Sequence, residues 1–148
     1  MDVGATSTTR FSRKTMEIHL NEICKEHYEH MKAKGFHNEP MQLGTALMLV
    51  VSELGEALEA DRKMRYANIP MFEKRINESD DRGSDLLKKH IFKESFEECV
   101  KDTIEDEIAD TFLRLFDLCG AMGIDIDKHI ELKMRFNKTR QYMHGKKY

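Results

Sequence analysis

Residues 40–63 read PMQLGTALMLVVSELGEALEADRK, and their apolar side chains recur at the spacing of an α-helix. Intervals of three and four residues separate Leu43, Leu47, Val50, Leu54 and Leu58. Pro40 is a residue type that is favoured in the first turn of a helix. We therefore expect a helix over about 40–63, with this stripe facing the core.

The same reasoning predicts three more long helices, over about 13–34, 101–122 and 126–143. Their ends are indicated by Gly35, by Gly123 and, as the N-cap of the last helix, by Asp125. Four long helices and no strand pattern place the chain in the all-α class, as a bundle of four main helices.

Residues 64–100 are less regular than the helices on either side. They contain Pro70 and a polar run over 77–85, which reads as a loop or mobile linker. Short helices are expected around it at about 71–76 and 86–96. The stretch is therefore interpreted as a helical and loop insertion in the bundle.

Length and composition exclude several classes of protein. A chain of 148 residues predicts one domain, here over 13–148 after a disordered lead-in at 1–12. A formal net charge of −3 argues against stable nucleic-acid binding, and the longest apolar run, 46–51, is far below the ~18 residues of a membrane span. Three cysteines without a CxxC spacing favour a reduced, cytoplasmic setting.

Glu53 is out of place for an ordinary surface charge. It is followed three residues later by Glu56, and its own helix row is apolar, with Ala46, Leu49, Ala57 and Ala60. The helix over 101–122 repeats this pattern. Its acidic pair, Glu107 and Asp110, has the same spacing as Glu53 and Glu56 and the same angular offset from an apolar stripe. That stripe comprises Ile104, Ile108, Leu115 and Leu118.

Packing the two helices together would bring four carboxylates to the edge of a core, where their mutual repulsion calls for cations. Ligands that are all oxygen favour Mg²⁺, with Mn²⁺ as a substitute, over Zn²⁺. No histidine has a glutamate three residues before it, which argues against a di-iron bundle. The alternative is four exposed helix charges, and Arg114 is placed to form an ion pair with Asp110 at i+4.

The last predicted helix has two unlike faces. Leu132, Phe136 and Met143 are expected to pack on the core, whereas the opposite face carries Lys133, Asn137 and Arg140. A basic stripe in the same domain as an acidic cluster suggests a metal–polyphosphate ligand, although a solvated surface is the competing interpretation. The chain has no GxxxxGK[ST] phosphate loop.

Three motifs, in order, resemble a known family. Glu53-Leu-Gly-Glu56 followed by Glu107-Ile-Ala-Asp110 resembles the ExxE…ExxD signature of the MazG-like all-α nucleoside triphosphate pyrophosphohydrolases. The tail from Lys133 through Asn137 to Arg140 is similar to that family's C-terminal Lys-xxx-Asn-xx-Arg element. The stretch between the two acidic motifs is longer here than is usual in the family.

The resemblance implies Mg²⁺-dependent hydrolysis of nucleoside triphosphates, canonical or modified, to a monophosphate and pyrophosphate, as a house-cleaning activity on the nucleotide pool. It implies four metal ligands, namely Glu53, Glu56, Glu107 and Asp110, one of which, or an acid beside them, would activate the water. It also implies phosphate or sugar contacts from Lys133, Asn137 and Arg140, base contacts from Phe36 and His37, and a homodimer or homotetramer.

Two alternatives of other classes remain open at the level of sequence. One is a non-catalytic helical module that binds nucleotides or a partner protein, and the other is a structural adaptor in which all four acids are exposed. Base and sugar preference, the number of metal ions and the role of residues 64–100 are not encoded in any of these motifs.

Overall fold

The computed structural model describes residues 19–80 and 83–140, and this part of the chain forms six helices and no strand. The all-α class is therefore confirmed. The helices are α1 (Leu20–Ala33), α2 (Leu43–Arg62), α3 (Ile69–Asp80), α4 (Asp85–Cys99), α5 (Ile104–Met122) and α6 (Ile126–Lys138). None of these helices has the length and apolar character needed to cross a membrane. The lead-in expected at 1–12 and the helix start expected at 13–18 lie outside the described residues.

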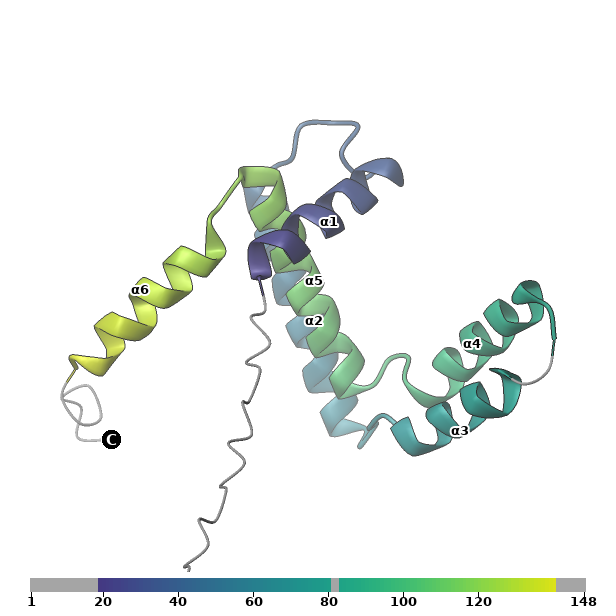
Figure 1. The fold of residues 1–148 in the computed structure, drawn as a ribbon. Coiled ribbons are helices and arrows are strands. Elements are labelled where there is room, and N and C mark those ends of the chain that lie inside the picture. The colour runs from purple at the N-terminus through teal and green to yellow at the C-terminus, as the bar shows by residue number, and fades with distance from the viewer. Residues whose placement is uncertain (1–18, 81–82, 141–148) are drawn as a thin grey trace, which may run out of the picture.

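Helix α5 is the centre of the main body, since α1 and α2 both pack along it (Figure 1). Gly120 permits the close approach of α1. A Cβ atom at this position would lie 2.5 Å from the carbonyl oxygen of Cys24 and 2.6 Å from Cβ of Tyr28. The helix ends, as predicted, at Gly123, which adopts the left-handed conformation with φ 63°.

The N-termini of α1 and α6 cap each other. The Asp127 carboxylate accepts hydrogen bonds from the backbone N–H groups of Leu20 and Asn21, both at 3.1 Å. In return, Oδ1 of Asn21 accepts from the N–H of Ile126 at 2.8 Å. These bonds satisfy N–H groups that a helix cannot pair internally, and they join two segments far apart in the sequence.

The remainder of α6 differs from the sequence prediction. The helix contacts α1, extends away from α2 and α5, and contains no buried residue (Figure 1). Leu132 and Phe136 are 47% and 58% exposed, so the expected packing of this face on the core is wrong for the single chain. Helix α6 ends at Lys138, before the predicted end at Met143, which lies outside the described residues.

The two short helices expected within residues 64–100 are present and are longer than predicted, as α3 and α4. Helices α3 and α4 pack on each other as a hairpin that projects from the main body, and the helices extend into the polar run expected to be a loop (Figure 1). Contacts between aromatic rings join the two helices, with centroids 5.5 Å apart for Phe72 and Phe92. This packing stabilises helices that are longer than the local sequence alone indicates.

The chain enters and leaves this hairpin through two linkers that lie side by side. The N–H of Asn68 donates to the carbonyl oxygen of Cys99 at 2.8 Å, and the N–H of Ile104 donates to the carbonyl oxygen of Arg65 at 3.1 Å. The linkers are therefore fixed to each other next to the C-terminal end of α2.

The end of α2 is a tight turn. Met64 adopts a left-handed conformation (φ 54°), and the N–H of Arg65 donates back to the carbonyl oxygen of Ala60 at 2.9 Å. The start of α2 differs from the prediction, because the helix begins at Leu43 and Pro40 lies in the segment before it.

The face that α2 turns toward α5 is not the one that the leucine pattern predicted. The buried residues of α2 are Val50, Glu53, Ala57 and Ala60. The leucines of the predicted stripe, Leu43, Leu47, Leu54 and Leu58, are 46–51% exposed. On α5 the outcome is mixed: Leu118 of the predicted stripe is buried, Ile108 is 42% exposed, and Glu107 and Thr111 are buried as well. The acidic rows of α2 and α5 therefore face each other, and the leucine row of α2 is left on the outside of the chain.

Candidate metal centre

Helices α2 and α5 bring three carboxylates together between them. One oxygen atom from each of Glu53, Glu56 and Glu107 can be chosen so that all three lie within 4.8 Å of one another. Glu53 and Glu107 are only 7% and 6% exposed, and Glu56 is exposed. We refer to these three residues as the acidic cluster.

Glu107 is the most constrained member of the acidic cluster. Among the residues that the structure describes, none forms a hydrogen bond or ion pair with its carboxylate. Burial raises the pKa of this carboxyl from 4.5 to about 7, and the nearby charges of Glu56, Asp106 and Glu53 act in the same direction. Among the described residues no fully buried side-chain oxygen lacks a partner, so the Glu107 carboxylate opens onto the adjoining cavity, where a proton or a cation would stabilise it.

Glu53 has a cationic partner from the opposite helix. Nε and a terminal nitrogen of Arg114 both approach Oε1 of Glu53 at 3.0 Å. The sequence had suggested that Arg114 would pair with Asp110 along α5, and the ion pair instead crosses from α5 to α2. It does so because α2 and α5 pack with their acidic rows facing each other, which places Glu53 within reach of the guanidinium.

Asp110 is not part of the acidic cluster. It lies one turn after Glu107 on α5, is exposed, and borders a neighbouring cavity. Partial burial and the charges of Asp106 and Glu53 still raise its pKa, which shows that it lies in the electrostatic field of the cluster. Of the four carboxylates expected to converge, the chain brings three into one group and leaves the fourth at its border.

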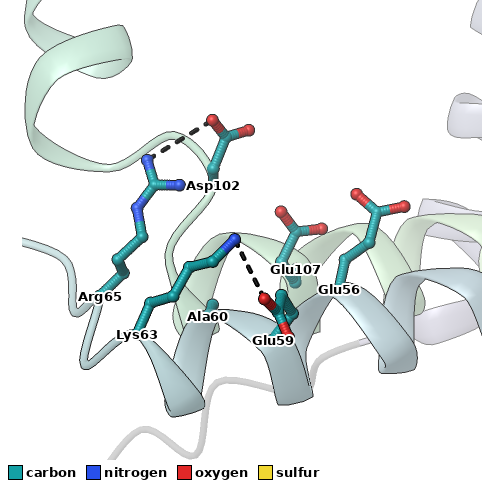
Figure 2. A pocket seen from close by; sticks show the side chains of 7 residues that line it. All are labelled: Glu56, Glu59, Ala60, Lys63, Arg65, Asp102 and Glu107. Atoms are coloured by element: carbon teal, nitrogen blue, oxygen red, sulfur yellow. Dashed lines mark ion pairs between the residues drawn. The ribbon is translucent and has the colours of Figure 1, made fainter.

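Two cavities flank the acidic cluster along the α2–α5 pair. One has a volume of about 190 Å³ and is lined by Glu56 and Glu107, together with Lys63 and Arg65 from the end of α2 (Figure 2). The other has a volume of about 250 Å³ and is bordered by Phe36, Asp110 and Arg114. The cluster thus lies between a charged cavity and one that includes an aromatic ring.

The loop between α1 and α2 supplies that aromatic ring. Phe36 is 68% exposed and lines the second cavity. His37 points elsewhere: its Nε2 donates a hydrogen bond to Oδ1 of Asp117 at 2.8 Å, and its ring makes an edge contact with Tyr28 at 4.7 Å. His37 therefore fastens the loop to α5 and α1, and Phe36 is the member of the pair that faces the cavity.

The basic residues expected to contact the ligand are not near the acidic cluster in the single chain. Lys133, Asn137 and Arg140 are all exposed, on and just after α6, and α6 contacts α1 rather than α2 or α5. In Figure 1 this helix extends to the side of the main body away from the α3–α4 hairpin.

Sequence reasoning missed Lys63 and Arg65, which share a cavity with Glu56 and Glu107. It named Arg114 but with the wrong partner, since Arg114 pairs with Glu53. A signal for Lys63 exists, because it lies seven residues after Glu56 and hence on the same face of α2. Arg65 carries no such signal, since its position depends on the turn at Met64.

The donor set of the acidic cluster fits a hard divalent cation. All ligand atoms are carboxylate oxygens from two helices, without histidine or cysteine, and the buried carboxylate of Glu107 has no other partner among the described residues. No family model, no curated protein and no solved structure matches this chain. The chemistry of the site therefore rests on its own geometry.

Proposed function

We propose that this protein is a Mg²⁺-dependent nucleoside triphosphate pyrophosphohydrolase of the cytoplasm, acting on canonical or modified nucleotides, and that it is MazG-like. The observation that carries the proposal is Glu107, buried without a cationic partner beside Glu53 and Glu56. When ionised, such a carboxylate is stabilised by a cation, and an oxygen-only donor set favours a hard one. Mn²⁺ is the natural substitute.

In the proposed reaction, water attacks the α-phosphorus, the bond from that phosphorus to the α,β-bridging oxygen breaks, and pyrophosphate leaves with the bridging oxygen. A divalent cation held by the acidic cluster neutralises charge on the phosphates. The residues of the chain hold that cation from α2 and α5, and one carboxylate of the cluster, or Asp110 beside it, takes the proton of the attacking water.

The second cavity supports a place for the nucleoside. Phe36 offers an exposed ring for stacking, and the contact from His37 to Asp117 holds the loop that carries it. Asp110 and Arg114 border both this cavity and the acidic cluster. A nucleotide whose base lies against Phe36 would therefore present its phosphates to the cluster.

We further propose that the active form is a homodimer or homotetramer. Five apolar side chains form one row on α2 and are each about half exposed: Leu43, Leu47, Val51, Leu54 and Leu58. A row of this kind is typical of a helix that packs on a partner. A second copy could also bring Lys133, Asn137 and Arg140 of its α6 to the cluster, which they do not reach in the single chain.

The direct test is to incubate the full chain with a panel of ribo- and deoxynucleoside triphosphates and Mg²⁺ and to resolve the products. We expect monophosphate and pyrophosphate. Diphosphate with orthophosphate would overturn the proposed bond cleavage, and binding without any product would favour the non-catalytic module.

Matched variants connect that activity to the site. Glu53→Gln and Glu107→Gln should each abolish turnover while circular dichroism stays helical. Glu97→Gln, on the exposed surface of α4, serves as the control and should leave turnover unchanged. Full activity in both cluster variants would contradict the assigned metal site.

A further inference from the structure

The cavity at the end of α2 has an acidic end and a basic end. Figure 2 shows the carboxylates of Glu56 and Glu107 on one side, and Lys63 and Arg65 at the other side with Glu59 and Asp102 beside them; the Lys63 side chain extends toward Glu59 and the Arg65 side chain toward Asp102. The phosphate contacts suggested by the sequence come from α6, which does not reach this cavity. Lys63 and Arg65 are thus basic residues beside the acidic cluster that have no assigned role.

The acidic end is open to a ligand. Glu107 is 6% exposed and Glu56 is exposed, and no described residue forms a hydrogen bond or an ion pair with either carboxylate. A buried carboxylate that lines a cavity and has no partner favours a cation there.

The basic end has partners that are easily exchanged. Lys63 pairs with Glu59 at 3.1 Å and Arg65 pairs with Asp102 at 3.6 Å. All four side chains are 48–57% exposed. Ion pairs exposed to this degree are weak, so a multiply charged anion can compete for the two cations.

The backbone around the two cations is fixed. Arg65 donates its N–H to the carbonyl oxygen of Ala60 and accepts at its own carbonyl from the N–H of Ile104, at 2.9 and 3.1 Å. Met64 between the two cations is held in the left-handed conformation. The backbone of this turn therefore holds Lys63 and Arg65 at one end of the cavity, and only their side chains would move when a ligand binds.

The ligand that matches both ends carries a divalent cation on a compact polyanion. At about 190 Å³ the cavity is smaller than the ~300–1,000 Å³ of ordinary small-molecule sites, so it fits a compact polyanion better than a whole nucleotide. Its four acids would repel a free anion, and a cation at Glu56 and Glu107 removes that repulsion. We propose that Lys63 and Arg65 form an anion site that binds pyrophosphate together with the divalent cation held by the acidic cluster.

This inference rests on the proposed function and deepens it, because pyrophosphate is the proposed leaving group. While it is still part of the triphosphate, the β- and γ-phosphates would occupy the Lys63–Arg65 site. The nucleoside would lie on the opposite side of the cluster, toward Phe36. Guanidinium and ammonium groups are the side chains that phosphate oxygens bind most strongly.

The test is calorimetric titration of the full chain with inorganic pyrophosphate in the presence of Mg²⁺. We expect Lys63→Gln and Arg65→Gln each to weaken binding by about tenfold or more, since each removes one charge-assisted contact. Arg62→Gln is the matched control, because Arg62 pairs with the same Glu59 at 3.6 Å and does not line the cavity. The affinity of this variant for pyrophosphate should stay within about twofold of the wild-type affinity.

Three results would overturn the inference: wild-type protein that does not bind pyrophosphate, cavity variants with wild-type affinity, or an equal loss in Arg62→Gln. Hydrolysis of nucleoside triphosphates, measured separately, distinguishes this failure from failure of the proposed function. An active enzyme with unaffected variants refutes the anion site alone. Pyrophosphate binding that depends on Lys63 and Arg65 in a protein without turnover refutes the hydrolase alone.

Discussion

Glu107 makes the stability of the metal-free protein depend on pH. Its carboxyl has a pKa of about 7 in the folded state, against 4.5 for an unperturbed glutamate, so between these values the folded chain holds a proton that the unfolded chain releases. The free energy of unfolding should therefore fall as pH rises from about 5 to 8, by up to ~3 kcal/mol at ~1.4 kcal/mol per pKa unit. Urea unfolding in the presence of EDTA measures this.

The control for that prediction is Glu107→Gln, which cannot titrate and should lose most of the decrease. Asp110, whose pKa is also raised, contributes in the same direction at lower pH. Adding Mg²⁺ at pH 8 should restore the stability of the wild-type protein, because a ligand that binds only the folded state stabilises that state. Stability that is flat or rises between pH 5 and 8 in both proteins would contradict the buried, unpaired carboxylate.

Arg114 offers a second prediction at the residue scale. Arg114→Gln leaves the Glu53 carboxylate, whose side chain is 9% exposed, without its cationic partner. We expect the metal-free protein to lose about 1–3 kcal/mol of unfolding free energy, since an unpaired buried group costs about that much. Lys93→Gln on α4 removes only an exposed i,i+4 pair and should change stability by less than about 0.5 kcal/mol. Equal effects of the two variants would mean that the pair across α2 and α5 is not formed.

The packing of whole helices depends on one small residue. Gly120→Ala places a methyl group 2.5 Å from the backbone of α1 at Cys24, so α1 and α5 must separate. The expected loss is about 1–3 kcal/mol, as for other overpacked interiors. Gly55→Ala on α2 is the control, because nothing lies within 4 Å of its added atom. It should raise stability by about 0.5–1 kcal/mol through helix propensity, and thermal unfolding of both variants measures the contrast.

The sequence predicts where most helices of this protein lie along the chain better than it predicts which face of each helix is buried. The existence of α1, α2, α5 and α6 follows from local spacing and end residues such as Gly35 and Gly123. The direction in which each helix faces does not follow. Leucines at regular intervals on α2 indicate a face that avoids water, and they do not say which neighbour covers it. In the single chain that neighbour is not α5, which lies against Glu53 and Ala57 instead.

The candidate site shows the same division. The pairing of Glu53 and Glu56 with Glu107 could be predicted, because matched spacing on two helices encodes it. The partner of Arg114 and the position of Arg65 could not, since both depend on contacts between segments distant in sequence. Asp110 has the spacing of a cluster member, yet it lies at the border of the cluster and lines the second cavity. The helices of the α3–α4 hairpin were predicted too short, and their pairing was not predicted, because they pack on each other through residues distant in sequence such as Phe72 and Phe92.

At the scale of the whole molecule, the exposed row on α2 predicts an interface between two copies of the chain, in a dimer or within a tetramer. Val51→Glu, at a position 53% exposed, should convert the protein to a monomer with an unchanged helical spectrum, because a buried interfacial charge without a partner is costly. Leu86→Glu, which is 79% exposed at the start of α4 and outside this row, should leave the dimer intact. Sedimentation equilibrium gives the mass of each. A wild-type monomer, or a dimer that tolerates Val51→Glu, would refute this use of α2.

The position of α6 makes a last prediction about how such a dimer completes its sites. If Arg140 serves the cluster of the other copy, then Glu107→Gln and Arg140→Gln are each inactive alone but complement when mixed. A mixed dimer has one site with both defects and one site with neither, so random exchange should restore about a quarter of wild-type turnover. If Arg140 instead acts on the cluster of its own chain, mixing restores no turnover, because every site then contains one of the two substitutions. Turnover measured after subunit exchange therefore reports directly whether α6 acts on its own chain or on its partner.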